Sequence, residues 1–140
     1  MISKNTVSFV RSLHQKKFRS EHNLFIVEGE KMVDELFESD FVIHSLFATD
    51  KWEGSKLSFK GKELLTIVTE KVLEQLSTLK TPNQVVAVVH QPEIKFNNEL
   101  KNKFYLALDK ITDPGNMGTI LRIADWFGLP FTITLYWFYK

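Results

Sequence analysis

Residues 104–135 read FYLALDKITDPGNMGTILRIADWFGLPFTITL, which is the pattern of a strand, a tight turn, a helix and a second strand. Its first part, Phe104–Leu108, is a short apolar run that suits a strand buried on both faces. The run Asp113–Asn116 (DPGN) predicts a tight turn, because Pro presets one φ angle while Gly and Asn tolerate positive φ. From Met117 onward, apolar residues recur at helical spacing: Ile120, Ile123, Ala124 and Phe127.

The second part of the stretch returns to strand character. Gly128 and Pro130 are typical of the end of a helix, and the run Phe131–Leu135 that follows is again apolar and β-branched. A strand, a helix and a strand in such close succession predict a βαβ unit, in which the two strands run parallel.

Polar residues at the start of the predicted helix allow two interpretations. In a βαβ unit the turn after the first strand faces the ligand side of the sheet, and a helix N-terminus offers free N–H groups to anions. Asn116 and Gly118 lie there, and Arg122 follows one turn later. The alternative is structural: Asp113 and Asn116 cap the helix, and Arg122 pairs with an acid three residues on.

The spacing of these residues is similar to a known motif. Residues 109–128 resemble the first signature motif of the SpoU (TrmH) family of RNA ribose methyltransferases, in the SPOUT superfamily. The matching positions are Asp113, Pro114, Asn116, Gly118, Arg122, Ala124, Phe127 and Gly128. The resemblance implies that residues 104–140 begin a knotted, Rossmann-like SPOUT domain.

The resemblance also implies a reaction, namely transfer of a methyl group from S-adenosylmethionine to a ribose 2′-hydroxyl of rRNA or tRNA. Arg122 and Asn116 are then the expected catalytic residues. Because an Arg side chain stays protonated, we expect Arg122 to clamp a phosphate and stabilise charge on the 2′-oxygen, while Asn116 orients Arg122 or the nucleotide. Family members usually pair through this domain, so a homodimer is expected for a full-length protein.

The composition of the chain limits its domain count and argues against metal and membrane binding. The 140 residues suit one domain, or a small domain with part of another, and 44% of them are hydrophobic, enough for a packed core. Cysteine is absent, which fits a cytoplasmic protein, and the four histidines lack metal-ligand spacing, so no metal is expected. No apolar run could span a bilayer, and none resembles a signal peptide, so no membrane partner is expected.

Charge is unevenly distributed near the N-terminus. Residues 1–20 contain no acid but carry five cations: Lys4, Arg11, Lys16, Lys17 and Arg19. We expect a helix over the first part of this segment and a basic turn over Gln15–Ser20. Bases around the single aromatic Phe18 suit an RNA backbone with a stacked base nearby. The equally supported alternative is a solubilising helix end, where cations complement the helix dipole.

The intervening chain predicts alternating strands and helices. The expected strands are Asn23–Val27, Val42–Ala48, Leu64–Val68 and Gln84–His90, and the expected helices are Glu30–Ser39 and one that begins after the N-cap Thr69. Lys51–Lys62 is polar and predicts a loop. Together these elements indicate an α/β sandwich over residues 1–90. Residues 91–103 (QPEIKFNNELKNK) predict a linker to the segment 104–140.

The region 1–90 is similar to the RNA-binding domain that precedes the catalytic domain in many SpoU-family enzymes and resembles a ribosomal-protein fold. The similarity rests on a basic turn, a strand and a Glu-Gly pair, here Lys17, Arg19, Glu28 and Gly29. It implies that Lys17 and Arg19 contact RNA, and charge adds Lys16 and Arg11. Glu28 is expected to be structural, and Gly29 to need a positive φ.

The last residues raise a different expectation. Family members continue with two later motifs that supply the cofactor pocket and the knot, whereas this sequence ends in YWFYK. We therefore expect the 140-residue chain alone to be inactive and not to bind S-adenosylmethionine. Two other classes of protein stay open: a non-catalytic RNA-binding module formed by residues 1–90, and a nucleotide-binding fragment. The second is weaker, because no Gly-x-Gly-x-x-Gly or P-loop pattern is present.

Overall fold

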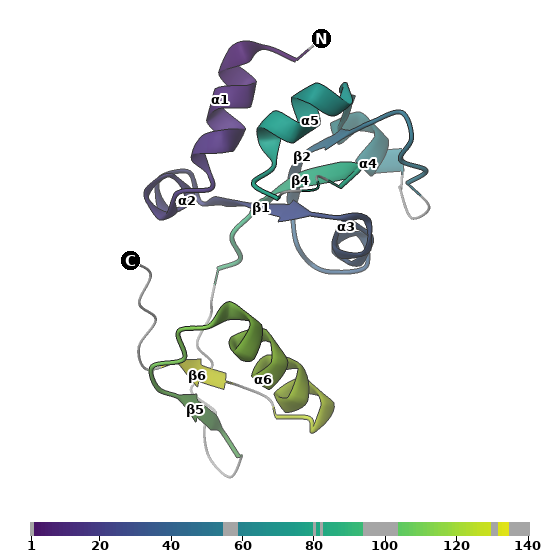
Figure 1. The fold of residues 1–140 in the computed structure, drawn as a ribbon. Coiled ribbons are helices and arrows are strands. Elements are labelled where there is room, and N and C mark those ends of the chain that lie inside the picture. Colours follow the sequence, from purple (N-terminus) through teal and green to yellow (C-terminus); the bar gives the residue numbers. More distant parts are fainter. Residues whose placement is uncertain are drawn as a thin grey trace. The chain divides into compact units, whose positions relative to one another are not determined.

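The computed structural model describes residues 2–54, 59–79, 81, 83–93, 104–129 and 132–134 (Figure 1). The chain divides into two compact units, residues 1–94 and 95–140. Within the described ranges, no helix is long and apolar enough to cross a membrane. Most of the expected linker 91–103 and the aromatic end 135–140 lie outside the described residues.

Unit 1, residues 1–94, is a mixed α/β unit built on one sheet. Its strands are β1 (Leu24–Glu28), β2 (Ile43–Ala48), β3 (Leu65–Ile67) and β4 (Val85–His90). Its helices are α1 (Lys4–Ser12), α2 (Lys16–His22), α3 (Glu30–Phe37), α4 (Phe59–Leu64) and α5 (Glu70–Leu76). The strand order is β1-β4-β2-β3, where β4 runs antiparallel to both neighbours and β2 pairs parallel with β3.

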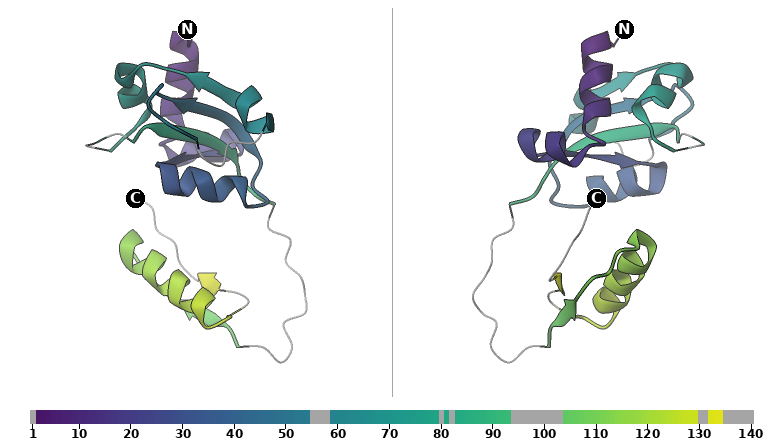
Figure 2. Two further views of the ribbon diagram at one scale, coloured as in Figure 1. Left: turned by 90° about the vertical axis from the view of Figure 1, so that its right-hand side faces the viewer. Right: turned by 60° about the vertical axis from the view of Figure 1, so that its left-hand side comes forward.

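The sheet of unit 1 is covered by helices on both faces (Figure 2). Successive residues of a strand point to opposite faces, so each strand contributes to two cores. On one face Val86 and Val88 of β4 pack with buried residues of α1 and α5. On the other face Val85, Ala87 and Val89 of the same strand pack with buried residues of α3.

Two local expectations for unit 1 are wrong. The basic segment expected to form a turn is the helix α2, because its Lys, Arg and Glu residues are good helix formers and Asn23, with φ of 54°, ends the helix in the left-handed conformation. The expected loop 51–62 contains the start of α4. Both errors arise because short polar helices carry little apolar periodicity.

Unit 2 contains β5 (Leu106–Leu108), α6 (Pro114–Trp126) and β6 (Thr132–Thr134), with β5 and β6 parallel. The helix begins three residues before the expected Met117, because Pro is well suited to its first turn. Burial of the first strand on both faces is not found: Ala107 is exposed and Phe104 is 86% exposed.

Gly29, between β1 and α3, has the positive φ that the sequence predicted, at 104°. We expect Gly29→Ala to destabilise unit 1 by about 1–2 kcal/mol, since a Cβ is strained at this φ. Urea unfolding followed by circular dichroism measures the change. Ser20→Ala, at an exposed helical position, is the control and should shift stability by less than about 0.5 kcal/mol. Equal midpoints for the two variants would contradict the assignment.

His44 and His90 lie together near the end of the sheet, with ring centroids 5.6 Å apart. Desolvation, and then repulsion from His90, hold the pKa of His44 below its ordinary value of 6.5. A lowered pKa in the folded state means that protonation favours unfolding. The stability that His44 contributes is therefore present above about pH 6.5 and is lost as the pH falls through the folded pKa.

We accordingly expect His44→Gln to reduce the loss of stability between about pH 7.5 and pH 5. Thermal unfolding at the two pH values measures this loss. Ser45→Ala is the control, because it removes the hydroxyl within 3.2 Å of His44 Nδ1 but keeps the imidazole. An acid-induced loss that is unchanged in His44→Gln would show that other groups cause it.

Candidate functional site

The N-terminus of α6 is fixed by Asp113, as the structural interpretation predicted. Its Oδ1 accepts a hydrogen bond from the backbone N–H of Asn116 at 2.7 Å, and Pro114 takes the first helical position. Asn116 is therefore in the first turn of the helix, with its backbone N–H satisfied and its side chain exposed. Its amide is free to act on something outside the helix.

Arg122 extends back towards this N-terminus. Its Nη2 donates to Thr119 Oγ1 at 3.1 Å, and that hydroxyl donates to the carbonyl of Gly115 at 2.9 Å. The Nη1 atom lies 3.4 Å from the point where Gly118 would carry a Cβ. The alternative pairing of Arg122 with Asp125 is not found, because the only salt bridge among the described residues is Lys51–Glu70.

This geometry can bind an anion. The guanidinium of Arg122 extends towards the N-terminus of α6, which is the positive end of the helix dipole, so both would attract a phosphate or a developing oxyanion. Arg122 is exposed, which leaves its other N–H groups accessible. Since an Arg does not deprotonate in proteins, it can stabilise charge and position a substrate, but it cannot itself act as a base.

An apolar hollow of about 270 Å³ adjoins Arg122. It is lined by Thr119, Arg122, Ile123, Trp126 and Phe127. All of these come from α6 or its C-cap, and Trp126 and Phe127 are 87% and 75% exposed. A hollow on one helix does not enclose a nucleoside-sized methyl donor, so the described residues do not by themselves fit S-adenosylmethionine. They also include no cluster that could hold a metal ion.

Lys16 and Lys17 begin α2 and are exposed. The first turn of α2 has no acid and Gln15 provides no side-chain cap, so two cations stand at the positive end of the helix dipole. Lys16 and Lys17 therefore do not complement the dipole of α2. Lys17 Nζ lies 5.6 Å from the ring centroid of Phe18, which holds the ammonium beside an aromatic face.

Arg19 has a different environment from the lysines. Its Nη1 donates to the carbonyl of His14 at 2.7 Å and to that of Leu13 at 3.3 Å. Arg19 therefore caps the C-terminal end of α1 and fixes the position of α2 against it. Its remaining N–H groups could still reach a ligand. The structure thus assigns this expected RNA contact a structural role that charge counting did not reveal.

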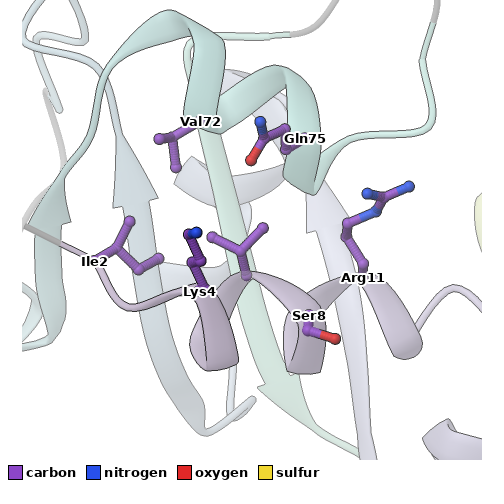
Figure 3. Close-up of a pocket in the computed structure, with 7 residues that line it drawn as sticks. Ile2, Lys4, Ser8, Arg11, Val72 and Gln75 are labelled. Atoms are coloured by element: carbon purple, nitrogen blue, oxygen red, sulfur yellow. The ribbon is translucent and has the colours of Figure 1, made fainter.

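Arg11, in the last turn of α1, lines a groove between α1 and α5 (Figure 3). Nearby, His14 Nε2 donates to the carbonyl of Leu76 at 2.7 Å and joins the ends of the two helices. Sequence reasoning missed Lys4, Ser8 and Gln75 as groove residues. The signal present in the sequence was the helical spacing of Lys4, Ser8 and Arg11, but their partner helix lies about sixty residues away.

Glu28, expected to be structural, is part of the same unit. Its carboxylate accepts a hydrogen bond from the hydroxyl of Ser77, directly after α5. This bond ties the end of β1 to the loop before β4. Glu28 therefore supports the fold.

The chain is similar in sequence to a known domain family and to known RNA methyltransferases. The MRM3-like substrate binding domain profile matches residues 4–87. RlmP of Bacillus subtilis, named 23S rRNA (guanosine(2553)-2′-O)-methyltransferase, is 33% identical over 119 residues, which cover 85% of this chain and 46% of that protein.

Two solved structures are also similar. One, from Porphyromonas gingivalis and assigned to the TrmH family of RNA methyltransferases, has a TM-score of 0.76 and 30% identity and covers 96% of this chain. The other, the AdoMet-bound rRNA methyltransferase of Sinorhizobium meliloti, has a TM-score of 0.74 and 29% identity and covers all of this chain. The chain spans 52% and 54% of those two chains respectively.

The chain thus spans about half the length of the relatives it matches. The domain profile covers most of unit 1, and the similar structures extend over unit 2 as well. The chain therefore belongs to the SpoU/TrmH family of RNA methyltransferases, and its first unit is an MRM3-like substrate-binding domain.

Proposed function

We propose that this chain is the RNA-binding and motif-bearing part of an RNA 2′-O-ribose methyltransferase. The observation that carries the proposal is the position of Arg122, whose guanidinium extends back along α6 to Thr119 and Gly118, towards the exposed N-terminus of the helix. A relative named as a 23S rRNA 2′-O-methyltransferase makes rRNA the favoured substrate over tRNA. The methyl donor in this proposal is S-adenosylmethionine, named as bound in a similar structure.

The chemistry assigned to Arg122 and Asn116 is stabilisation and orientation. A ribose 2′-hydroxyl is a poor nucleophile until its proton is drawn off or its developing negative charge is stabilised. Arg122 would hold the adjacent phosphate and stabilise charge on the 2′-oxygen, with Thr119 keeping the guanidinium in place. Asn116 would orient the target nucleotide through its exposed amide. No step is assigned to the methyl donor, because the described residues do not enclose it.

The finer architecture follows from the same proposal. Residues 1–90 would form a ribosomal-protein-like α/β sandwich that binds substrate, residues 91–103 a linker, and residues 104–140 the βαβ start of a knotted SPOUT domain. Helices on both faces of the sheet and the parallel pair β5–β6 support this division. Homodimer formation through the catalytic domain and action in the cytoplasm complete the proposal; absence of cysteine fits a reducing compartment.

RNA binding is assigned to the cations of α1 and α2. Lys16 and Lys17 carry most of the argument, because their placement at the start of α2 opposes the helix dipole and so favours a role in binding an anion. Arg11 extends the basic surface along α1. Arg19 would contribute through the N–H groups that α1 does not use, while it also positions α2.

The RNA assignment predicts a change in salt dependence. Changing Lys16→Ala and Lys17→Ala together should weaken binding of a single-stranded rRNA fragment and flatten the plot of log affinity against log salt by about one to two units. Fluorescence anisotropy at several salt concentrations measures the slope. The matched control, Lys31→Ala with Lys62→Ala, removes the same charge from exposed positions on α3 and α4. Equal slopes for the two pairs would move the RNA surface elsewhere.

The catalytic assignment is tested in a chimera, because the chain spans about half of its relatives. The C-terminal half of the Bacillus subtilis relative is joined after β6, and transfer of labelled methyl groups to rRNA is measured. Arg122→Ala should lower turnover by about a hundredfold or more, as loss of an oxyanion-stabilising group does, with RNA affinity retained. Arg122→Lys, which keeps the charge but not the planar fork, should be intermediate.

Normal turnover by Arg122→Ala would contradict the catalytic role. A chimera without activity, together with salt-dependent RNA binding by the chain, would favour the non-catalytic RNA-binding module instead.

A further inference from the structure

A groove separates α1 from α5 on one face of unit 1 and has a volume of about 460 Å³. Its lining residues come from both helices and the segment before α1: Ile2, Lys4, Val7, Ser8, Arg11, Val72 and Gln75. In Figure 3, Ile2 lies at one end and Arg11 at the other, while Val72 and Gln75 face them from α5. Because the α1 residues recur at i, i+3, i+4 and i+7, they share one face of that helix.

The floor of the groove is apolar and packs on the core of unit 1. Ile2, Val7 and Val72 are partly buried and pack against the core formed by α1, α5 and the sheet. Their outer surfaces can therefore contact a flat apolar group without disturbing the fold. Above this floor, the Gln75 amide can both donate and accept hydrogen bonds, and the Ser8 hydroxyl can do the same. The combination matches the face and the polar edge of a nucleobase.

The two charged residues that line the groove, Lys4 and Arg11, are both positive. Lys4 and Arg11 are exposed and lie about 10 Å apart along the helix axis, seven residues at about 1.5 Å per residue. No acid lines the groove, and the one ion pair in the described part of the chain, Lys51–Glu70, does not involve it. An acidic peptide would set carboxylates against an apolar floor, whereas a nucleotide sets its base there and its phosphates near the flanking cations.

We propose that the groove between α1 and α5 binds one unstacked base of single-stranded RNA, with Lys4 and Arg11 on the flanking phosphates. The inference rests on the proposed RNA-binding function and adds a base-binding site to it. Arg11 has a planar guanidinium that can also stack on the base. A base within a duplex is already stacked and paired, so the groove adds affinity for single-stranded RNA only.

The test compares two probes and a matched pair of variants in the full 140-residue chain. The probes are a fluorescein-labelled single-stranded RNA of about twelve nucleotides and the same RNA annealed to its complement. Ser8→Leu places a bulky side chain in the groove, and Asn5→Leu places the same side chain on an exposed α1 position that does not line it. Gln75→Ala removes the amide with little risk to α5, because Ala favours helices.

Ser8→Leu should weaken binding of the single strand by about fivefold or more, in line with the loss of one stacked base, and leave duplex binding unchanged. Gln75→Ala should act in the same direction by about threefold. Asn5→Leu should match the unmodified chain with both probes. Thermal unfolding of each variant verifies that the helices are intact, and Gln75→Ala keeps the test decisive if Ser8→Leu does not fold.

Four outcomes would overturn the inference. If Ser8→Leu and Gln75→Ala bind both probes as the unmodified chain does, the groove takes no base, although the chain still binds RNA. If these two variants weaken the binding of single-stranded and duplex RNA equally, the groove contacts only the sugar–phosphate backbone of the RNA. If the unmodified chain binds a poly-glutamate peptide, and Ser8→Leu abolishes that binding while Asn5→Leu does not, the groove belongs to an acidic protein partner. If the unmodified chain binds neither probe, the proposed RNA-binding function fails together with the inference.

Discussion

Burial of β4 on both faces is the constraint on which unit 1 depends. Residues Val85–Val89 are fully buried, pair with β1 and β2, and contribute to the cores on both sides of the sheet. One core holds α1 and α5, and the other holds α3. A polar side chain at any of these five positions would lack a partner, so the apolar run is required by the fold.

The position of the basic surface follows from this packing. Since α1 and α5 share one core, their outer edges meet in a groove, and the His14–Leu76 hydrogen bond holds them together. Arg19 then fixes α2 against the end of α1. The helices that carry these cations are thus fixed to one another, so binding need not order their backbones.

Unit 2 shows how one helix can combine structural and functional residues. Asp113 satisfies the first turn of α6, and this capping bond leaves the Asn116 side chain and the N-terminal end of the helix exposed. The bond from Arg122 to Thr119 directs the guanidinium to the same end. The spacing of Gly118 and Arg122 has a physical reason: residues four positions apart share a helix face, and Arg122 Nη1 lies 3.4 Å from the point where Gly118 would carry a Cβ.

The strand β4, the capped helix α6, the positive φ of Gly29 and the family motif could all be predicted from the sequence, because each depends on local conformation or short-range periodicity. Local signals do not reveal that Arg19 binds the end of α1 or that α5 completes a groove with α1. These two features come from tertiary packing, because α2 has to lie against the end of α1 and the groove joins residues about sixty positions apart.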